Sequence, residues 1–108
     1  MEHNEKQYTV LISPGVNDRM AEHFIFLAEV NAAAASRLLD TLLQDIRSLS
    51  EHPFRAPVYE RDFTPAGKYR YLLSAKRYRI VYTIEGDVVY VDDIQDCRQE
   101  DGKSLLAP

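Results

Sequence analysis

Residues 68–99 read KYRYLLSAKRYRIVYTIEGDVVYVDDIQDCRQ, and this stretch decides the fold. Apolar and polar side chains alternate along most of it, which is the two-residue period of a half-buried β-strand. Two short segments, Ala75-Lys76 and Glu85-Gly86-Asp87, divide the alternation, and the glycine supplies the positive φ that a tight hairpin needs. The stretch therefore predicts three antiparallel strands in a meander.

The position of the first turn decides which side chains share a face of this sheet. If Ala75 and Lys76 form a two-residue turn, the face that we assign to the core carries Tyr69, Tyr71, Leu73, Tyr78, Ile80 and Tyr82. The opposite, solvent-facing surface then carries Arg70, Leu72, Ser74, Arg77, Arg79 and Val81. The last strand would place Val89 or Val91 beside Tyr82, and Asp92 or Ile94 beside Arg79. Arg70 and Arg79 are thus expected on one exposed surface.

The first half of the chain has the patterns of one strand and two helices. Residues 7–13 (QYTVLIS) are rich in β-branched and apolar side chains, and Ser13 followed by Pro14 is a helix-start signal. Two apolar stripes at helical spacing follow, made of Val16, Met20, Phe24 and Leu27 and then of Ala35, Leu38, Leu39, Leu42, Ile46 and Leu49. Asn31 separates them, which predicts an αα-hairpin. The predicted fold is α+β: an N-terminal strand, an αα-hairpin and an antiparallel β-meander, in two layers.

Length and composition fit one soluble domain over residues 1–108, with flexible tails at residues 1–7 and 100–108. The chain is 45% hydrophobic and 28% charged. No apolar run is long enough for a membrane span or a signal peptide, so we expect a cytoplasmic protein. Cys97 is the single cysteine, and no metal-ligand spacing is visible among the cysteine and histidines. We expect no metal and no other cofactor.

Charge is unevenly distributed along the chain. The net charge of −4 argues against a general nucleic-acid binder. Residues 55–79 are nevertheless strongly basic, and residues 85–101 are acidic apart from Arg98. One interpretation pairs the two segments across the sheet, with the arginines held structurally by Asp92, Asp93 and Asp96. The other makes the arginines a phosphate-binding surface, since guanidinium groups bind phosphate through two hydrogen bonds.

The order of these elements and several local motifs resemble the RelE/ParE superfamily of toxins from bacterial type II toxin–antitoxin systems. The resemblance covers about residues 8–99 and rests on YTVLISPGVNDRM (8–20), VNAAAASRLLDTL (30–42) and GKYRYLLSAKRYRIVYTIEGDVVYVDDIQDCRQ (67–99). Its most specific part is YRIVY (78–82), followed by a glycine turn, an apolar strand and Cys97-Arg98.

The RelE branch of the superfamily implies a ribosome-dependent endoribonuclease that cleaves messenger RNA without a metal. The resemblance gives catalytic positions to Arg70, Arg79 and Arg98, which would stabilise charge on the reacting phosphate. The neighbouring candidates for substrate binding are Lys68, Lys76, Arg77 and Tyr90. The chain departs from the RelE pattern at Leu72, where RelE has a second lysine, and at Gln99-Glu100-Asp101, where related nucleases carry a histidine and a tyrosine.

The ParE branch of the superfamily implies an inhibitor of DNA gyrase that works by protein–protein contact. A RelE-fold binding protein with weak or no catalysis is a further alternative. Either branch implies a cognate antitoxin that lays a helix and an extended segment around the toxin. Phe26 points away from the first apolar stripe and is a candidate contact for that antitoxin. Ile25 is a second candidate, although we expect it to pack in the core.

Overall fold

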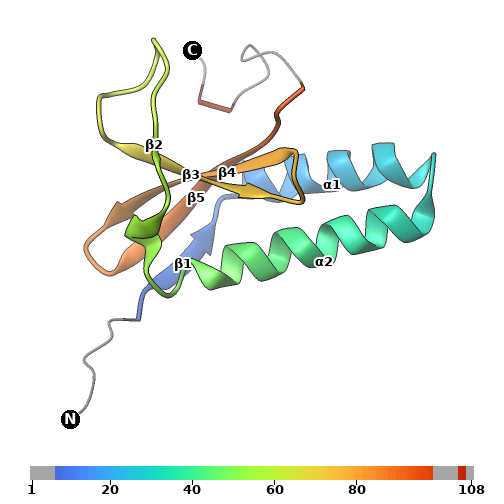
Figure 1. Cartoon of the computed structure of the whole chain (residues 1–108), viewed down its shortest axis with the longest axis horizontal. Coiled ribbons are helices and arrows are strands. Elements are labelled where there is room, and N and C mark those ends of the chain that lie inside the picture. The colour runs from blue at the N-terminus through green and yellow to red at the C-terminus, as the bar shows by residue number, and fades with distance from the viewer. Residues whose placement is uncertain (1–6, 99–104, 107–108) are drawn as a thin grey trace.

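The computed structural model describes residues 7–98 and 105–106, and these form a sheet layered against a pair of helices (Figure 1). In chain order the elements are β1 (Thr9–Ile12), α1 (Pro14–Ala28), α2 (Ala32–Ser48), the 3-10 turn η1 (Pro53–Arg55), β2 (Val58–Tyr59), β3 (Tyr69–Ser74), β4 (Tyr78–Glu85) and β5 (Val88–Asp96). The predicted α+β class and element order are confirmed. The predicted tails fall mostly outside the described residues.

The five strands form one mixed sheet in the order β1-β5-β4-β3-β2. β1 lies at one edge, parallel to β5, with Thr9 opposite Val88 and Ile12 opposite Val91. The strands of the meander are antiparallel. Because α1 and α2 pack on one side only, the sheet has a helix-covered face, which carries Ile80 and Tyr82, and an opposite face, which we call the outer face.

Both helices begin where the sequence predicts. Ser13 caps α1, its hydroxyl oxygen accepting the Val16 N–H at 3.3 Å, and Pro14 occupies the first turn. Asn31 caps α2 in the same way, its Oδ1 accepting the Ala34 N–H at 2.9 Å. The Asn31 cap explains why α2 can start within a few residues of the end of α1.

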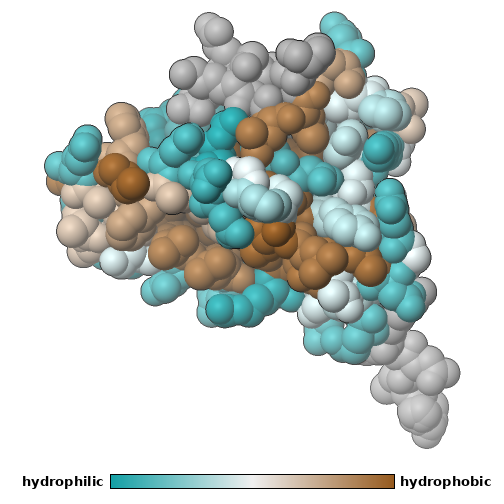
Figure 2. Space-filling view, turned by 180° about the vertical axis from the view of Figure 1, so that it is seen from behind, coloured by the Kyte–Doolittle hydropathy of each residue, from teal (hydrophilic) through white to brown (hydrophobic). Residues whose placement is uncertain are grey.

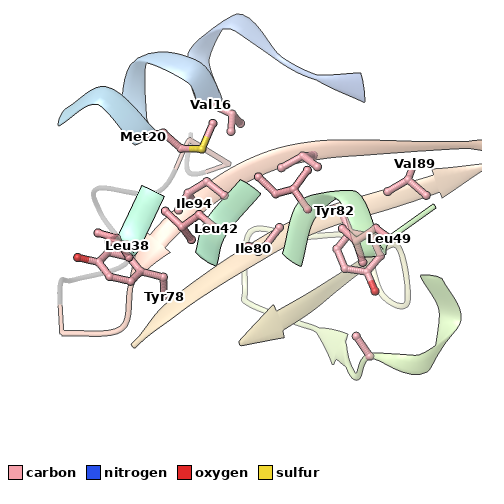
Figure 3. Close-up of a cluster of buried hydrophobic side chains, with 13 residues drawn as sticks. Val16, Met20, Leu38, Leu42, Leu49, Tyr78, Ile80, Tyr82, Val89 and Ile94 are labelled. Carbon is pink, nitrogen blue, oxygen red and sulfur yellow. The ribbon is translucent and has the colours of Figure 1, made fainter. Parts of the chain in front are cut away.

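The core lies between the helix pair and the helix-covered face (Figure 3). Leu42 and Ile80 are fully buried at its centre, and Met20 closes it on the α1 side. At one end, Leu38 of α2 lies beside Tyr78 of β4. The leucine stripe of the second helix therefore has the core role that its spacing predicts. Ile25, expected in the core, is instead 58% exposed, and Phe26 is 67% exposed.

The register of β3 and β4 differs from the prediction by one residue. Arg70 lies opposite Tyr82, and Leu73 lies opposite Arg79. The hairpin has an extra residue because Ala75 and Lys76 both adopt positive φ, of 51° and 68°, and Arg77 follows them before the ladder starts at Tyr78. A slip of one residue moves every side chain of a strand to the other face. The prediction that Arg70 and Arg79 share a face is therefore wrong: Arg70 is on the helix-covered face and Arg79 on the outer face.

The same slip reverses the predicted positions of Tyr69, Tyr71 and Leu73. All three lie on the outer face, and Leu73 is 54% exposed. Only Tyr78 and Tyr82 of the four tyrosines assigned to the core are there, at 3% and 0% exposure.

A β-bulge changes the pairing of β4 with β5. Val81 lies opposite Asp93, but Tyr82 lies opposite Val91, so Asp92 is an extra residue in β5. Tyr82 lies beside Val91, one of the two neighbours predicted for it. Arg79 has neither of its predicted neighbours, because it lies opposite Gln95 instead of Asp92 or Ile94. The bulge places two consecutive carboxylates, Asp92 and Asp93, toward the outer face.

None of the helices within residues 7–98 and 105–106 is long and apolar enough to cross a membrane.

Candidate functional site

The three arginines predicted as a catalytic group are not brought together. Arg70 holds the segment before β2: its Nη1 donates to the carbonyls of Phe54 at 3.3 Å and Ala56 at 2.6 Å. Its guanidinium carbon also lies 5.2 Å from the centroid of the Phe54 ring. Arg70 is thus occupied in fastening η1 to β3, on the face away from Arg79.

Arg98 and Arg77 both bind Asp96, at the end of β5. Nη2 of Arg77 lies 2.8 Å from Oδ2 of Asp96, and Nε of Arg98 lies 3.6 Å from Oδ1. The Arg98 backbone N–H also donates to Oδ1 at 3.0 Å. Burial alone would raise the pKa of Asp96, but these hydrogen bonds and the two guanidinium charges together lower it. Ionised Asp96 therefore stabilises the fold above the ordinary aspartate pKa, and this stabilisation is lost as pH falls through the lowered value.

Arg79 belongs to a hydrogen-bonded group on the outer face, which we call the outer-face network: Tyr59, Arg79, Asp93 and Gln95. The Tyr59 hydroxyl and Nε of Arg79 both donate to Oε1 of Gln95, each at 3.2 Å. The Gln95 amide then donates from Nε2 to Oδ2 of Asp93 at 2.9 Å. Residues from β2, β4 and β5 are thereby linked across the sheet, and each hydrogen bond fixes the direction of the next.

Asp93 is the most enclosed charged group of this network, with 0% exposure. Its Oδ1 accepts the Ile94 N–H at 2.8 Å. Its Oδ2 accepts the Leu105 N–H at 2.9 Å in addition to the Gln95 amide. Since buried carboxylates need several donors, this arrangement stabilises the ion and also connects residue 105 to the sheet.

Two guanidinium groups converge on the ring of Tyr59. The Arg61 guanidinium carbon lies 4.5 Å from the ring centroid, and that of Arg79 lies 6.0 Å from it. Tyr71 packs edge-on at 6.2 Å, and Tyr59 is only 1% exposed. The outer face therefore combines arginine and tyrosine side chains around a rigid, buried ring.

The remaining predicted substrate contacts are dispersed. Lys68 is exposed, with its ammonium 5.4 Å from the Tyr69 ring centroid, and Lys76 is exposed in the β3–β4 turn. Tyr90 lies opposite Thr83 and is half-buried, on the same face as Arg79. The described part of the chain contains no group of three His, Cys, Asp or Glu side chains that could hold a metal ion.

Tyr59, Gln95 and Arg61 belong to this surface, although no sequence pattern predicted them there. Tyr59 stands in a strand of two residues, too short for alternation to show which way it faces. The position of Gln95 could not be predicted from the sequence, because it lies opposite Arg79 only as a result of the bulge. The interpretation of the arginines as structural is partly right, since Asp96 binds Arg77 and Arg98, whereas Arg79 binds an amide.

Asp92 gives a prediction about pH. Burial raises its pKa above the ordinary aspartate value, although the Thr83 hydroxyl donates to Oδ2 at 3.0 Å and works in the opposite direction. A raised pKa means that the protonated form stabilises the fold below the unfolded-state pKa of about 4, and that this stabilisation is lost as pH rises. Asp92→Asn keeps an acceptor for Thr83 without the charge. We expect it to raise the melting temperature at pH 7 by about 2–4 °C, the shift that about 0.5 kcal/mol gives in a domain of this size.

Thermal unfolding followed by circular dichroism at pH 7 and pH 4 measures this effect. The difference between variant and wild type should disappear toward pH 4, and Asp62→Asn, at an exposed position, is the control. An Asp92→Asn variant less stable than wild type at pH 7 would show that the charge is favourable.

This chain resembles known proteins in its sequence profile and in its fold. Residues 10–100 match the sequence profile of the family described as "ParE toxin of type II toxin-antitoxin system, parDE". Among solved structures, the "Chromosomal ParDE TA system from P. aeruginosa" superposes with a TM-score of 0.70 and 6% sequence identity, covering 83% of this chain and 96% of that chain. At that identity the likeness shows the fold alone. Curated protein sequences give no significant match.

Proposed function

The chain belongs to the ParE toxin family of type II toxin–antitoxin systems, and we propose that it stops growth by binding DNA gyrase and is neutralised by a cognate antitoxin. The target would be engaged by protein–protein contact and not by cleavage of RNA. Action on gyrase also implies that the protein works in the cytoplasm.

The observation that supports binding over cleavage is the separation of the three arginines. A nuclease without a metal needs cationic groups that converge on one phosphate, with an acid and a base in reach. Arg70 instead faces the helices, Arg79 lies on the outer face, and Arg98 pairs with Asp96. His23 is buried at the helix–sheet interface against the Ile94 carbonyl, at 3.1 Å, and so lies away from Arg79.

The outer face has the composition of a protein-binding surface. Arginine and tyrosine are enriched where proteins bind each other, especially when neighbours hold them rigidly. Here Arg61 and Arg79 are held against Tyr59, and the exposed Leu73 and Leu11 add apolar area on the same face. Exposed hydrophobic side chains are not confined to the outer face: the side of the molecule seen from behind carries a broken hydrophobic band bordered by hydrophilic side chains (Figure 2), and Ile25 and Phe26 of α1 are exposed.

Ribosome-dependent cleavage of messenger RNA is the second candidate. It is favoured by the convergence of Arg61 and Arg79 on the Tyr59 ring, since two guanidinium groups over an aromatic ring can also bind a nucleic-acid backbone.

Induced expression in bacterial cells tests the proposal. The chain alone should arrest growth, and co-expression of the protein encoded by the neighbouring gene should restore it. Arg61→Glu combined with Arg79→Glu should relieve the arrest, because it reverses the charge of the outer face, whereas Arg47→Glu, on an exposed part of α2, should not. Normal growth on expression of folded wild-type protein would contradict the proposal.

A further inference from the structure

Arg79 is fixed at one end of its guanidinium group and open at the other. Its Nε donates to Oε1 of Gln95 at 3.2 Å, and the guanidinium carbon lies 6.0 Å from the centroid of the Tyr59 ring. Its Nη1 and Nη2 donate to none of the described residues, and no ion pair within residues 7–98 and 105–106 includes Arg79. A neutral amide therefore orients the group, and no carboxylate of these residues lies within ion-pair distance of it.

The two Nη atoms of Arg79 are accessible to solvent. In the described part of the chain, Nε of Arg77 is the only buried side-chain nitrogen or oxygen without a hydrogen-bond partner. Since the Nη atoms of Arg79 have no partner and are not buried, they can donate to a molecule bound at the outer face. Arg70, Arg77 and Arg98 differ, because Arg70 donates to two carbonyls and the other two bind Asp96.

An exposed apolar side chain lies beside this guanidinium group. Leu73 of β3 is directly opposite Arg79 of β4 and is 54% exposed. Directly opposite residues have their Cβ atoms about 5 Å apart, so the two side chains can contact the same bound segment. The position offers two parallel N–H donors next to an apolar surface. This combination fits a carboxylate next to a large apolar side chain.

A protein carboxylate fits this position better than a phosphate of a nucleic acid. The chain has a net charge of −4, and the buried Asp93 is linked to Arg79 through Gln95. Binding to a nucleic-acid backbone relies on several cations that contact successive phosphates. Leu73 would add nothing to phosphate contacts, whereas an apolar side chain beside an arginine is typical of the centre of a protein interface.

We propose that Arg79 and Leu73 bind a segment of DNA gyrase in which an Asp or Glu lies beside a large apolar side chain. The carboxylate accepts hydrogen bonds from Nη1 and Nη2 of Arg79, and the apolar side chain covers Leu73. Gln95 and Tyr59 already orient the guanidinium group, so little conformational entropy is lost when it binds. This inference rests on the proposed function, because it names the chemistry of the partner at the outer face.

The test measures the affinity of purified toxin variants for purified gyrase by titration calorimetry, with and without DNA. Arg79→Gln should weaken binding about 10- to 100-fold, the effect of losing a hydrogen bond to a charged group. Arg79→Lys keeps the charge but loses the two parallel donors, so its affinity should lie between those of wild type and Arg79→Gln. Leu73→Ser should weaken binding about 10-fold through the loss of buried apolar surface. All three effects should be the same with and without DNA.

Two variants away from the outer face are matched controls. Arg47→Gln removes an exposed arginine of α2, and Val30→Ser removes an exposed apolar side chain between α1 and α2. Both should leave the affinity for gyrase within about twofold of wild type. Far-ultraviolet circular dichroism establishes that every variant is folded.

A charge exchange tests for the carboxylate itself. Randomly mutated gyrase genes are selected in cells for survival of wild-type toxin expression, and the survivors should include gyrase in which an Asp or Glu is replaced by Lys or Arg. Arg79→Glu toxin should inhibit such a gyrase variant but not wild-type gyrase, because the two charges have been exchanged. Resistant gyrase variants that all stay insensitive to Arg79→Glu toxin would overturn the inference.

The outcomes separate this inference from the proposed function. Unchanged affinity in Arg79→Gln and Leu73→Ser overturns the inference while the proposed function stands. An effect of Arg79→Gln that requires DNA also overturns it and assigns Arg79 to a phosphate. If wild-type toxin does not bind gyrase, the gyrase half of the proposed function fails, and this inference fails with it.

Discussion

Asp93→Asn is expected to lower the free energy of unfolding by about 2–4 kcal/mol, although it changes a single atom type. A carboxylate only accepts hydrogen bonds, and both oxygens of Asp93 face donors: the Ile94 N–H at Oδ1, and the Gln95 amide and Leu105 N–H at Oδ2. An asparagine would turn an NH₂ group toward at least one of these donors. Because Asp93 is 0% exposed, bulk solvent does not reach the site to relieve the conflict.

Gln95 cannot resolve the conflict by rotating its amide. Rotation would turn Nε2 toward the Tyr59 hydroxyl and Nε of Arg79, which both donate to Oε1 in the native arrangement. Denaturant unfolding of wild type and Asp93→Asn measures the loss, with Asp62→Asn as the exposed control. A loss under about 0.5 kcal/mol, within the range of ordinary surface substitutions, would mean that the outer-face network does not stabilise the fold.

Tyr59→Ala is expected to destabilise the protein by about 3–5 kcal/mol, as for other large aromatic side chains removed from a closely packed site. Tyr59 is 1% exposed even though it lies on the face without helices. Arg61, Arg79 and Tyr71 surround its ring, and its hydroxyl donates to Gln95. Removing the ring leaves a cavity among these groups and takes away the aromatic face against which Arg61 and Arg79 pack.

Tyr59→Phe separates the ring from the hydroxyl. It keeps the packing and removes only the donor to Oε1 of Gln95, so its effect should be about 1 kcal/mol. Equal losses in Tyr59→Phe and Tyr59→Ala, measured by denaturant unfolding, would show that the hydroxyl and not the ring provides the stability. The variant that loses the ring should also lose toxicity, because Arg61 and Arg79 lose the aromatic ring against which both pack.

Local patterns predicted most of the fold correctly. The stripe through Leu38, Leu42 and Ile46 gave the second helix and its buried face, and Ser13 and Asn31 gave the helix starts. These features depend on residues a few positions apart. The same holds for the glycine turn at Gly86, whose φ is 59°.

The arrangement of the site was not predictable because it depends on single extra residues. Ala75 and Lys76 have no sequence signal for positive φ, yet they lengthen the hairpin and move Arg70 to the helix-covered face. Asp92 adds a bulge that no alternation pattern reveals and so places Gln95 opposite Arg79. Tyr59 reaches Gln95 across 36 positions of sequence, and a contact of that range follows only from the folded sheet.

The most direct test of the central claim uses purified protein in two assays, DNA supercoiling by gyrase and cleavage of ribosome-bound messenger RNA. We predict that the wild-type protein inhibits supercoiling, that Arg61→Glu combined with Arg79→Glu does not, and that the messenger RNA remains intact throughout. Messenger RNA cleavage by the wild-type protein that is lost in Arg79→Ala, with supercoiling unaffected, would contradict the account and make the outer face a catalytic surface.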